Sequence, residues 1–363
     1  MTHRFQIAIV FFIIHLSFGF LLYPELIYSL TDTGHWLVVL CQGVLQLLLI
    51  LLYMKGLNYF PNEDIVDIYL KMGRLIAFVI LLPFVLNLTV LVALNIRTYT
   101  EVINSLFLLR TPHWPIALLL YFISAYTATK GLGTILRSSV FIFFMIIPFI
   151  LFISFSSIVN FDFHNGFPIR DASFDFLLDM EFYYLMGFSA FLFLGFMVSN
   201  KPLVFRDILI AWFSVIILYL AFVYIPLFIF GQETVVTLSL PFVIAMDSVD
   251  IRWLAFNRQT MFFGISSIGF MLIFNAVMLW MISQIMQKLF SKLRVKSALW
   301  IIIFSIIGYI AGLFIPNQVW TNTLILWNRG AQVYFMLILP ITIYIYGVVI
   351  KRKGTSDERK SSL

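Results

Sequence analysis

Charged side chains are scarce in this sequence. Asp, Glu, Lys and Arg make up only 11% of its 363 residues, whereas 62% are apolar and the mean hydropathy is +1.02. A soluble domain carries roughly 25% charged residues, so the composition excludes a soluble fold. It predicts instead an all-α integral membrane protein, because a helix satisfies its own backbone hydrogen bonds inside a bilayer.

Other absences exclude classes of enzyme. Cys41 is the only cysteine, so the chain has neither an internal disulfide nor a thiolate cluster. It contains no phosphate-binding loop ending in Gly-Lys and no His-Glu-x-x-His metal motif. Gly187-Phe188-Ser189-Ala190 is similar to the serine motif of intramembrane proteases, but no histidine follows His164 to act as a general base. The sequence thus predicts a protein that is not an enzyme and needs no cofactor.

Long apolar runs fill most of the chain. A hydrocarbon core of about 30 Å takes about 20 apolar residues per helix, and this length predicts a single transmembrane domain over residues 1–363. The first run lacks a small-residue cleavage site and is predicted to remain as a helix. Residues 231–259, which charged side chains interrupt, are predicted to form an outer loop with a short helix near Leu240-Pro241. The ten predicted spans are 6–30, 36–54, 75–96, 114–130, 138–159, 182–200, 208–230, 260–287, 298–315 and 331–350.

The positions of Lys and Arg predict the orientation. With a cytoplasmic N-terminus, 17 of the 23 basic residues fall in inner segments and six, including Arg97 and Arg329, fall in outer loops. This asymmetry places both termini in the cytoplasm and explains the net charge of +6 without a nucleic-acid partner. The basic tail at 351–363 is a topology anchor that can also contact anionic lipid.

The ten spans divide into two repeats of five, 1–159 and 182–350, separated by the acidic loop 160–181. Because five is odd, the second repeat enters the membrane from the opposite side, and spans 1 and 6 become equivalent. Ser17-Phe18-Gly19 and Gly187-Phe188-Ser189 interrupt these two spans near their middles. Non-helical backbone is tolerated at membrane depth only where it lines a cavity or is buried in protein. The matched positions predict two broken helices around a midplane site, although each glycine alone is also typical of close helix packing.

Motifs along the chain resemble those of a known family. In their order they are similar to the B-subunit permeases of spore nutrient germinant receptors, and the resemblance runs over nearly the whole chain. His35-Trp36 departs from the Asp-Ala-Trp of many members, whereas Met186-Gly187-Phe188-Ser189 resembles the span-6 signature of the wider amino acid, polyamine and organocation transporter superfamily. The motifs are Phe60-Pro61, Lys71-Met72-Gly73-Arg74, Thr111-Pro112-His113-Trp114, and Tyr126-Thr127-Ala128-Thr129-Lys130-Gly131 followed by Arg137.

The resemblance implies a LeuT-like fold with a 5+5 inverted repeat, in the inner membrane of a bacterial spore. It also implies a larger A subunit and a lipoprotein C subunit as partners, and a role in sensing small nutrients. The residues themselves indicate how a ligand could bind. Apart from His15, the centres of the predicted spans contain almost no ionisable side chains. An unwound helix offers free N–H and C=O groups, which can hold an amino acid but equally a neutral sugar or nucleoside.

Other polar residues are candidates to complete such a pocket. Asn87 and Thr89 lie in span 3, while Ser266, Ser267 and Asn275 lie in span 8. The two serines are the kind of hydroxyl pair that can join span-1 carbonyls around a sodium ion. For each of these residues, a hydrogen bond to the backbone or to a neighbouring helix is an equally good interpretation. Phe18 and Phe188 either wall the pocket or face lipid, and His15 either contacts the ligand or packs as a hydrogen-bonded histidine.

Three hypotheses about function follow. The first is a germinant-sensing receptor subunit that binds a small nutrient, with an amino acid favoured, and signals through partner subunits. The shortage of charge inside the spans favours it, because buried charges usually mark ion pathways and proton relays. The second is an autonomous secondary transporter of amino acids. The third is a purely structural membrane subunit, for which neither glycine break matters.

Overall fold

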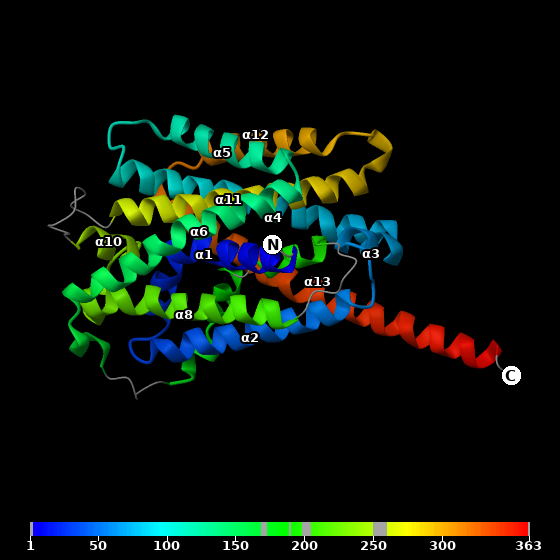
Figure 1. Cartoon of the computed structure of the whole chain (residues 1–363), viewed down its shortest axis with the longest axis horizontal. Helices are drawn as coiled ribbons and strands as arrows, with labels where there is room; N and C mark the ends of the chain where they lie inside the picture. Colours follow the sequence, from blue (N-terminus) through cyan, green and yellow to red (C-terminus); the bar gives the residue numbers. More distant parts are fainter. Residues whose placement is uncertain (1–2, 168–172, 189, 198–204, 250–259, 362–363) are drawn as a thin grey trace.

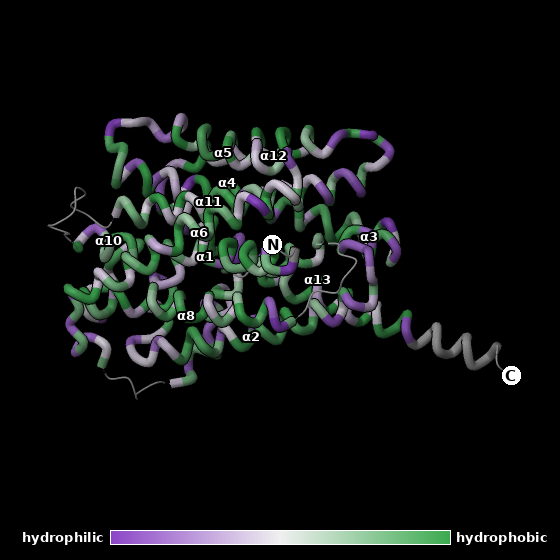
Figure 2. Tube along the Cα trace, viewed as in Figure 1, coloured by the Kyte–Doolittle hydropathy of each residue, from purple (hydrophilic) through white to green (hydrophobic). Residues whose placement is uncertain are grey.

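The computed structural model describes residues 3–167, 173–188, 190–197, 205–249 and 260–361. Within these residues, seven helices are long and apolar enough to cross a membrane. Figure 2 shows their apolar colouring, which gives way to polar residues mainly at the ends and in connecting segments. These helices are α1 (His3–Leu30), α2 (His35–Leu57), α4 (Arg74–Leu106), α6 (Leu132–Ser156), α8 (Phe205–Phe230), α11 (Thr260–Leu289) and α13 (Gln318–Ser361).

Three of the ten predicted spans correspond to shorter or irregular elements. α5 (His113–Thr129) and α12 (Ser297–Leu313) are apolar helices of 17 residues each. The sixth predicted span, 182–200, is no continuous helix in its described part. It begins within α7 (Met180–Tyr184) and continues as two 3₁₀ helices, η4 (Leu185–Phe188) and η5 (Phe191–Phe196). The count of ten transmembrane helices in two inverted repeats therefore remains a proposal.

The connecting segments carry short helices. The predicted helix near Leu240-Pro241 is confirmed as α10 (Pro241–Asp247), where proline occupies the first turn and its missing N–H costs no hydrogen bond. The predicted basic tail is helical to Ser361, because α13 continues past the apolar span, and Figure 1 shows this end projecting from the bundle. The other short elements are α3 (Ile65–Met72), η1 (Ser157–Asn160), η2 (Phe163–Gly166), η3 (Asp175–Leu178), α9 (Gln232–Val235) and η6 (Ser291–Leu293).

Helix α1 lies at the centre of the bundle and is mostly buried by other helices (Figure 1). It packs against α8, α11 and α6, while α13 packs against α2 and α4. α5 and α12 pair with each other along the edge formed by α4 and α11. This arrangement places η4 in contact with both α1 and α13.

Two charges that the sequence analysis placed in outer loops lie inside helices. Arg97 belongs to α4, where its Nε lies 2.7 Å from Glu101 Oε1 in an ion pair one helical turn away. Arg329 belongs to α13, which begins at Gln318 rather than at the predicted residue 331. The predicted loop positions are therefore wrong. Both arginines lie in stretches where polar side chains interrupt the apolar run, and tertiary packing rather than apolar composition keeps these stretches helical.

A charged cluster fixes α3 against the end of α11. Asp64 caps α3, and its side chain accepts a hydrogen bond from the Asp67 N–H at 3.0 Å. Lys288 Nζ contacts Asp64 Oδ2 and Asp67 Oδ2, each at 2.5 Å. Burial raises the pKa of the Asp64 carboxyl above its ordinary value, and its bonds to Lys288 counteract only part of that rise. At Asp67 burial also raises the pKa, but the hydrogen bond and charge of Lys288 together with the hydrogen bonds to Asp64 outweigh this effect, and the pKa is lowered.

Replacing Lys288 by methionine should lower the melting temperature of the purified protein. The change leaves the Asp64 carboxylate, whose side chain is only 7% exposed, without its cation. Breaking a fully buried pair costs about 3–5 kcal/mol, and because the Lys288 side chain is 30% exposed we expect about 2 kcal/mol. Lys292→Met removes an exposed charge nearby and is the control. If both variants melt alike, the cluster contributes nothing to stability.

Candidate functional site

Helix α1 is continuous through Ser17-Phe18-Gly19, so the prediction that it unwinds there is wrong. Gly19 serves close packing instead, because a Cβ at this position would lie 2.5 Å from Cε1 of Tyr219. The Tyr219 hydroxyl donates to the His15 carbonyl at 2.7 Å, and the Tyr99 hydroxyl donates to the Ser17 carbonyl at 2.5 Å. The glycine thus makes room for a tyrosine that bonds the backbone of an intact helix.

The interruption predicted around Gly187 is present. α7 ends at Tyr184, and 3₁₀ backbone replaces the α-helix on both sides of position 189, which lies outside the described residues. The backbone groups that this break releases are bound by side chains. The Ala190 N–H donates to His15 Nε2 at 3.3 Å, and the Tyr53 hydroxyl donates to the Leu192 carbonyl at 3.1 Å. Irregular backbone at membrane depth is tolerable here because neighbouring helices satisfy it.

His15 is hydrogen-bonded through both ring nitrogens. Its Nδ1 lies 2.7 Å from the Phe11 carbonyl, while its Nε2 accepts from Ala190. A histidine that donates through one nitrogen and accepts through the other is the neutral form. His15 therefore holds the break against α1 as a buried packing residue, in agreement with the second of the two interpretations of the sequence.

Arg329 is the principal site residue that the sequence analysis missed. It is only 4% exposed, and its guanidinium carbon lies 4.2 Å from the centre of the Phe188 ring. Its side chain packs where Gly187 has no Cβ, since an added Cβ would lie 2.8 Å from Arg329 Cγ. Among the described residues, Nε and Nη2 of Arg329 have no hydrogen-bond partner. The Glu25 carboxyl of α1 attracts the Arg329 guanidinium electrostatically. Among the described residues no direct salt bridge joins these two side chains.

A small cavity of about 10 Å³ lies beside this guanidinium. Such a volume holds about one water molecule, so the site is closed in this conformation. Two amide oxygens near it, Asn87 Oδ1 and Gln332 Oε1, also lack partners among the described residues. The Phe18 and Phe188 rings approach to 6.2 Å between centroids. The cavity is lined by Phe18, Leu91, Leu94, Gly187, Ile325, Asn328, Arg329 and Gln332.

The structure gathers only some of the predicted site residues around this cavity. Phe18 and Gly187 line it, Phe188 stacks on Arg329, and the Asn87 amide donates to Asn328 Oδ1 at 2.9 Å. Ser189 lies outside the described residues. Ser17 Oγ is buried without a described hydrogen-bond partner, but Ser17 does not line the cavity.

The remaining candidates bond within their own helices. Thr89 bonds to the Val85 carbonyl, and Asn275 donates to Met271 Sδ at 2.8 Å. The hydroxyls of Ser266 and Ser267 donate to the carbonyls of Phe262 and Gly264, one turn earlier in α11. The sodium hypothesis required the two serines to face α1 carbonyls. Among the described residues, their hydrogen bonds stay within α11. Thr89, Ser266 and Ser267 thus bond to backbone, as the second interpretation of the sequence predicted. Asn275 bonds a side chain of its own helix instead, and its Oδ1 has no partner among the described residues.

The signal that could have identified Arg329 is its helical spacing. Four of the cavity's lining residues follow the i, i+3, i+4, i+7 spacing and so share one face of α13: Ile325, Asn328, Arg329 and Gln332. In sequence, Asn328-Arg329-Gly330 has the composition of a loop, which obscured this face. The resulting site joins α1, α4, the break and α13 around one cation. Chemically it can hold an anionic group, and its amide oxygens can accept hydrogen bonds from a donor on the same ligand.

The fold is that of a membrane transporter. The crystal structure of MhsT in complex with L-phenylalanine superposes with a TM-score of 0.59, covering 96% of this chain and 98% of that chain at 13% sequence identity. MhsT has the LeuT fold, which confirms that part of the fold predicted from the sequence.

Residues 2–319 match the family model described as spore germination protein, and the chain therefore belongs to the spore germination permease family. Over 167 residues it is 26% identical to the spore germination protein YndE of Bacillus subtilis (strain 168). That match spans 45% of this chain and 46% of YndE, about half the length of the relative. The predicted family is confirmed. The chain is an integral membrane protein of the permease type.

Proposed function

We propose that this protein is the nutrient-sensing membrane subunit of a spore germinant receptor and that it binds an amino acid at the cavity beside Arg329. One observation carries the proposal. A buried guanidinium lacks hydrogen-bond partners for Nε and Nη2 among the described residues, next to the break at Gly187. An incompletely satisfied buried charge costs several kcal/mol, and a carboxylate is a bidentate partner for a guanidinium.

The closed cavity favours sensing through a change of conformation. With room for about one water, the site must open to admit an amino acid and close around it. A ligand shifts a conformational equilibrium only by as much as its affinity differs between the two states. Arg329 would supply this difference by pairing with the ligand in one state only. Family membership and the L-phenylalanine held by MhsT support germination and an amino acid as the ligand class.

The rest of the proposal depends on the family resemblance. The subunit acts with an A subunit and a lipoprotein C subunit in the inner spore membrane, with both termini in the cytoplasm. The distribution of Lys and Arg supports that orientation.

The experiment that separates sensing from transport uses the chain with and without its partners. The protein alone, in sealed vesicles, is tested for uptake of protein amino acids and of the amines that lack their carboxyl group. Spores carrying it with its partner subunits are then tested for germination with the same compounds. We expect germination by an amino acid, none by its matching amine, and no accumulation in the vesicles. Concentrative uptake by the isolated chain would instead establish an autonomous transporter.

The two glycines provide a test of the site. A Cβ at position 187 would displace the Arg329 side chain, and one at position 19 would displace Tyr219 from α1. Gly187→Ala and Gly19→Ala should therefore each shift the nutrient dose response of spores by about tenfold, or ~1.4 kcal/mol. Gly312→Ala is the control, because its added Cβ would meet only the Ala93 carbonyl oxygen, at 3.9 Å. Unchanged responses at normal protein levels in both variants would place the ligand elsewhere.

A further inference from the structure

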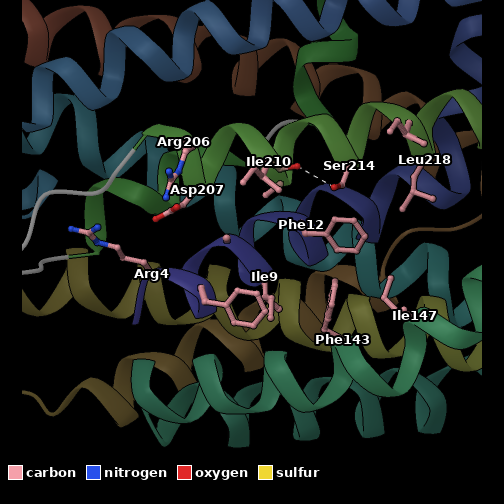
Figure 3. Close-up of a pocket in the computed structure, with 14 residues that line it drawn as sticks. Arg4, Ile9, Phe12, Phe143, Ile147, Arg206, Asp207, Ile210, Ser214 and Leu218 are labelled. Carbon is pink, nitrogen blue, oxygen red and sulfur yellow. Dashed lines mark hydrogen bonds between the residues drawn. The ribbon is translucent and has the colours of Figure 1, made fainter. Parts of the chain in front are cut away.

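A second and much larger cavity lies between α1, α6 and α8. Its volume is about 1030 Å³, and it shares no lining residue with the cavity beside Arg329. Helix α1 contributes Ala8, Ile9 and Phe12 to one wall, facing residues from the other two helices. Figure 3 shows Phe12 beside Phe143 and Ile147 of α6, with Leu218 of α8 nearby. The cavity is therefore an elongated groove with mainly apolar walls.

The groove opens sideways rather than toward the central site. Ile210 and Ile217 on its α8 wall are 62% and 50% exposed, so this edge faces the surrounding membrane. Neither α11 nor the described part of the break, which both pack against α1 from the interior, contributes a lining residue. Among the described residues the groove is therefore separate from the cavity beside Arg329.

The groove is polar at one end. Arg4 and Arg206 lie close to the beginnings of α1 and α8, and Figure 3 shows them with Asp207 at one end of the groove. Two cations and one anion leave a net positive charge there. Arg4 already takes part in another interaction, so Arg206, which is exposed, is the group most available to a ligand. The sequence places this end on the cytoplasmic side, where anionic lipid attracts basic residues.

We propose that the groove is a binding site for an anionic phospholipid of the surrounding membrane. One acyl chain lies between Phe12, Phe143 and Leu218, and the phosphate group pairs with Arg206 at the mouth, assisted by Arg4. The acyl chain of such a lipid matches the apolar walls of the groove, and its anionic head group matches the positively charged end. An occupant here contacts α1 and α8, the helices that carry His15 and Tyr219. The lipid thereby stabilises the arrangement of α1 that packs against the break.

The test uses the full-length protein purified in detergent and native mass spectrometry. Phosphatidylglycerol is compared with phosphatidylcholine carrying the same acyl chains. The protein should retain phosphatidylglycerol more strongly, and Arg206→Gln should lower its affinity about fivefold, the effect of losing one cation near a phosphate. Lys292→Gln, which removes an exposed charge outside the groove, should leave the affinity unchanged.

A second variant tests the apolar part of the groove. Ser214 lines it, is half-buried, and bonds only to the Ile210 carbonyl of its own helix among the described residues. Ser214→Trp should fill the groove and lower retention of both lipids, whereas Leu119→Trp on the exposed face of α5 should not. Equal retention of the two lipids by the unaltered protein would overturn the proposal. Equal losses of affinity in Arg206→Gln and Lys292→Gln would also overturn it. So would unchanged lipid retention in Ser214→Trp.

Discussion

Replacing Arg329 by methionine is expected to weaken germination strongly at amino acid concentrations that just saturate the unaltered receptor. Among the described residues the guanidinium is the one cation that lines the central cavity, and a hydrogen bond to a charged group contributes about 1.5–3 kcal/mol. Losing it should raise the half-effective concentration by roughly 10- to 100-fold. Arg329→Lys keeps the charge but lacks the planar guanidinium that pairs with a carboxylate. Its half-effective concentration should lie between those of the unaltered receptor and Arg329→Met. Germination of spores is measured over a range of amino acid concentrations.

The same variant separates a ligand-binding role from a structural one. Arg329 is buried with two nitrogens lacking partners among the described residues, so its removal relieves a desolvation cost. The melting temperature of Arg329→Met should therefore be unchanged or higher while the response is lost. Arg110→Met, at an exposed position between α4 and α5, is the matched control and should alter neither property. A lower melting temperature, or a full response at ordinary nutrient concentrations, would assign Arg329 a structural role.

The class of fold was predictable because the apolar runs are long. Helices such as α2 and α8 occur within a few residues of their predicted ends, since hydrocarbon length and backbone hydrogen bonding leave few alternatives. Prediction failed where polar residues continue a helix. α13 begins at Gln318, thirteen residues before the predicted start of its span at 331, because Thr321, Asn328 and Gln332 are buried against other helices. The apolar composition of a segment does not show which of its polar residues will be buried against other helices.

The site was predicted only in part, for a related reason. A glycine in an apolar run indicates either unwinding or close approach, and the two interpretations differ in what lies opposite it. Opposite Gly19 is the Tyr219 ring, and α1 stays helical. Opposite Gly187 is the Arg329 side chain, and the helix is broken. These neighbours are about 140 to 200 residues away in the sequence, so one sequence without relatives does not specify them.

Gly195→Ala is expected to be among the most destabilising single substitutions in the chain. An added Cβ would overlap the Tyr53 hydroxyl and lie 2.8 Å from Tyr53 Cζ. Tyr53 is fully buried, and its hydroxyl donates to the Leu192 carbonyl in the same irregular segment. Overpacking costs about 1–3 kcal/mol, and the unpaired carbonyl that results costs about 1–3 kcal/mol more. The yield of folded protein and its melting temperature in detergent measure the effect.

A double-mutant cycle shows whether the tyrosine hydroxyl is the cause. Tyr53→Phe alone should be mildly destabilising, because it leaves the Leu192 carbonyl unpaired. In the Gly195→Ala background it should instead stabilise, because it removes the atom that the new methyl group overlaps. Such a change of sign is diagnostic of direct contact, since independent substitutions are additive. Additive losses, or a Gly195→Ala variant no less stable than Gly312→Ala, would mean that η5 can move away from α2. The break would then not be held in place by Tyr53.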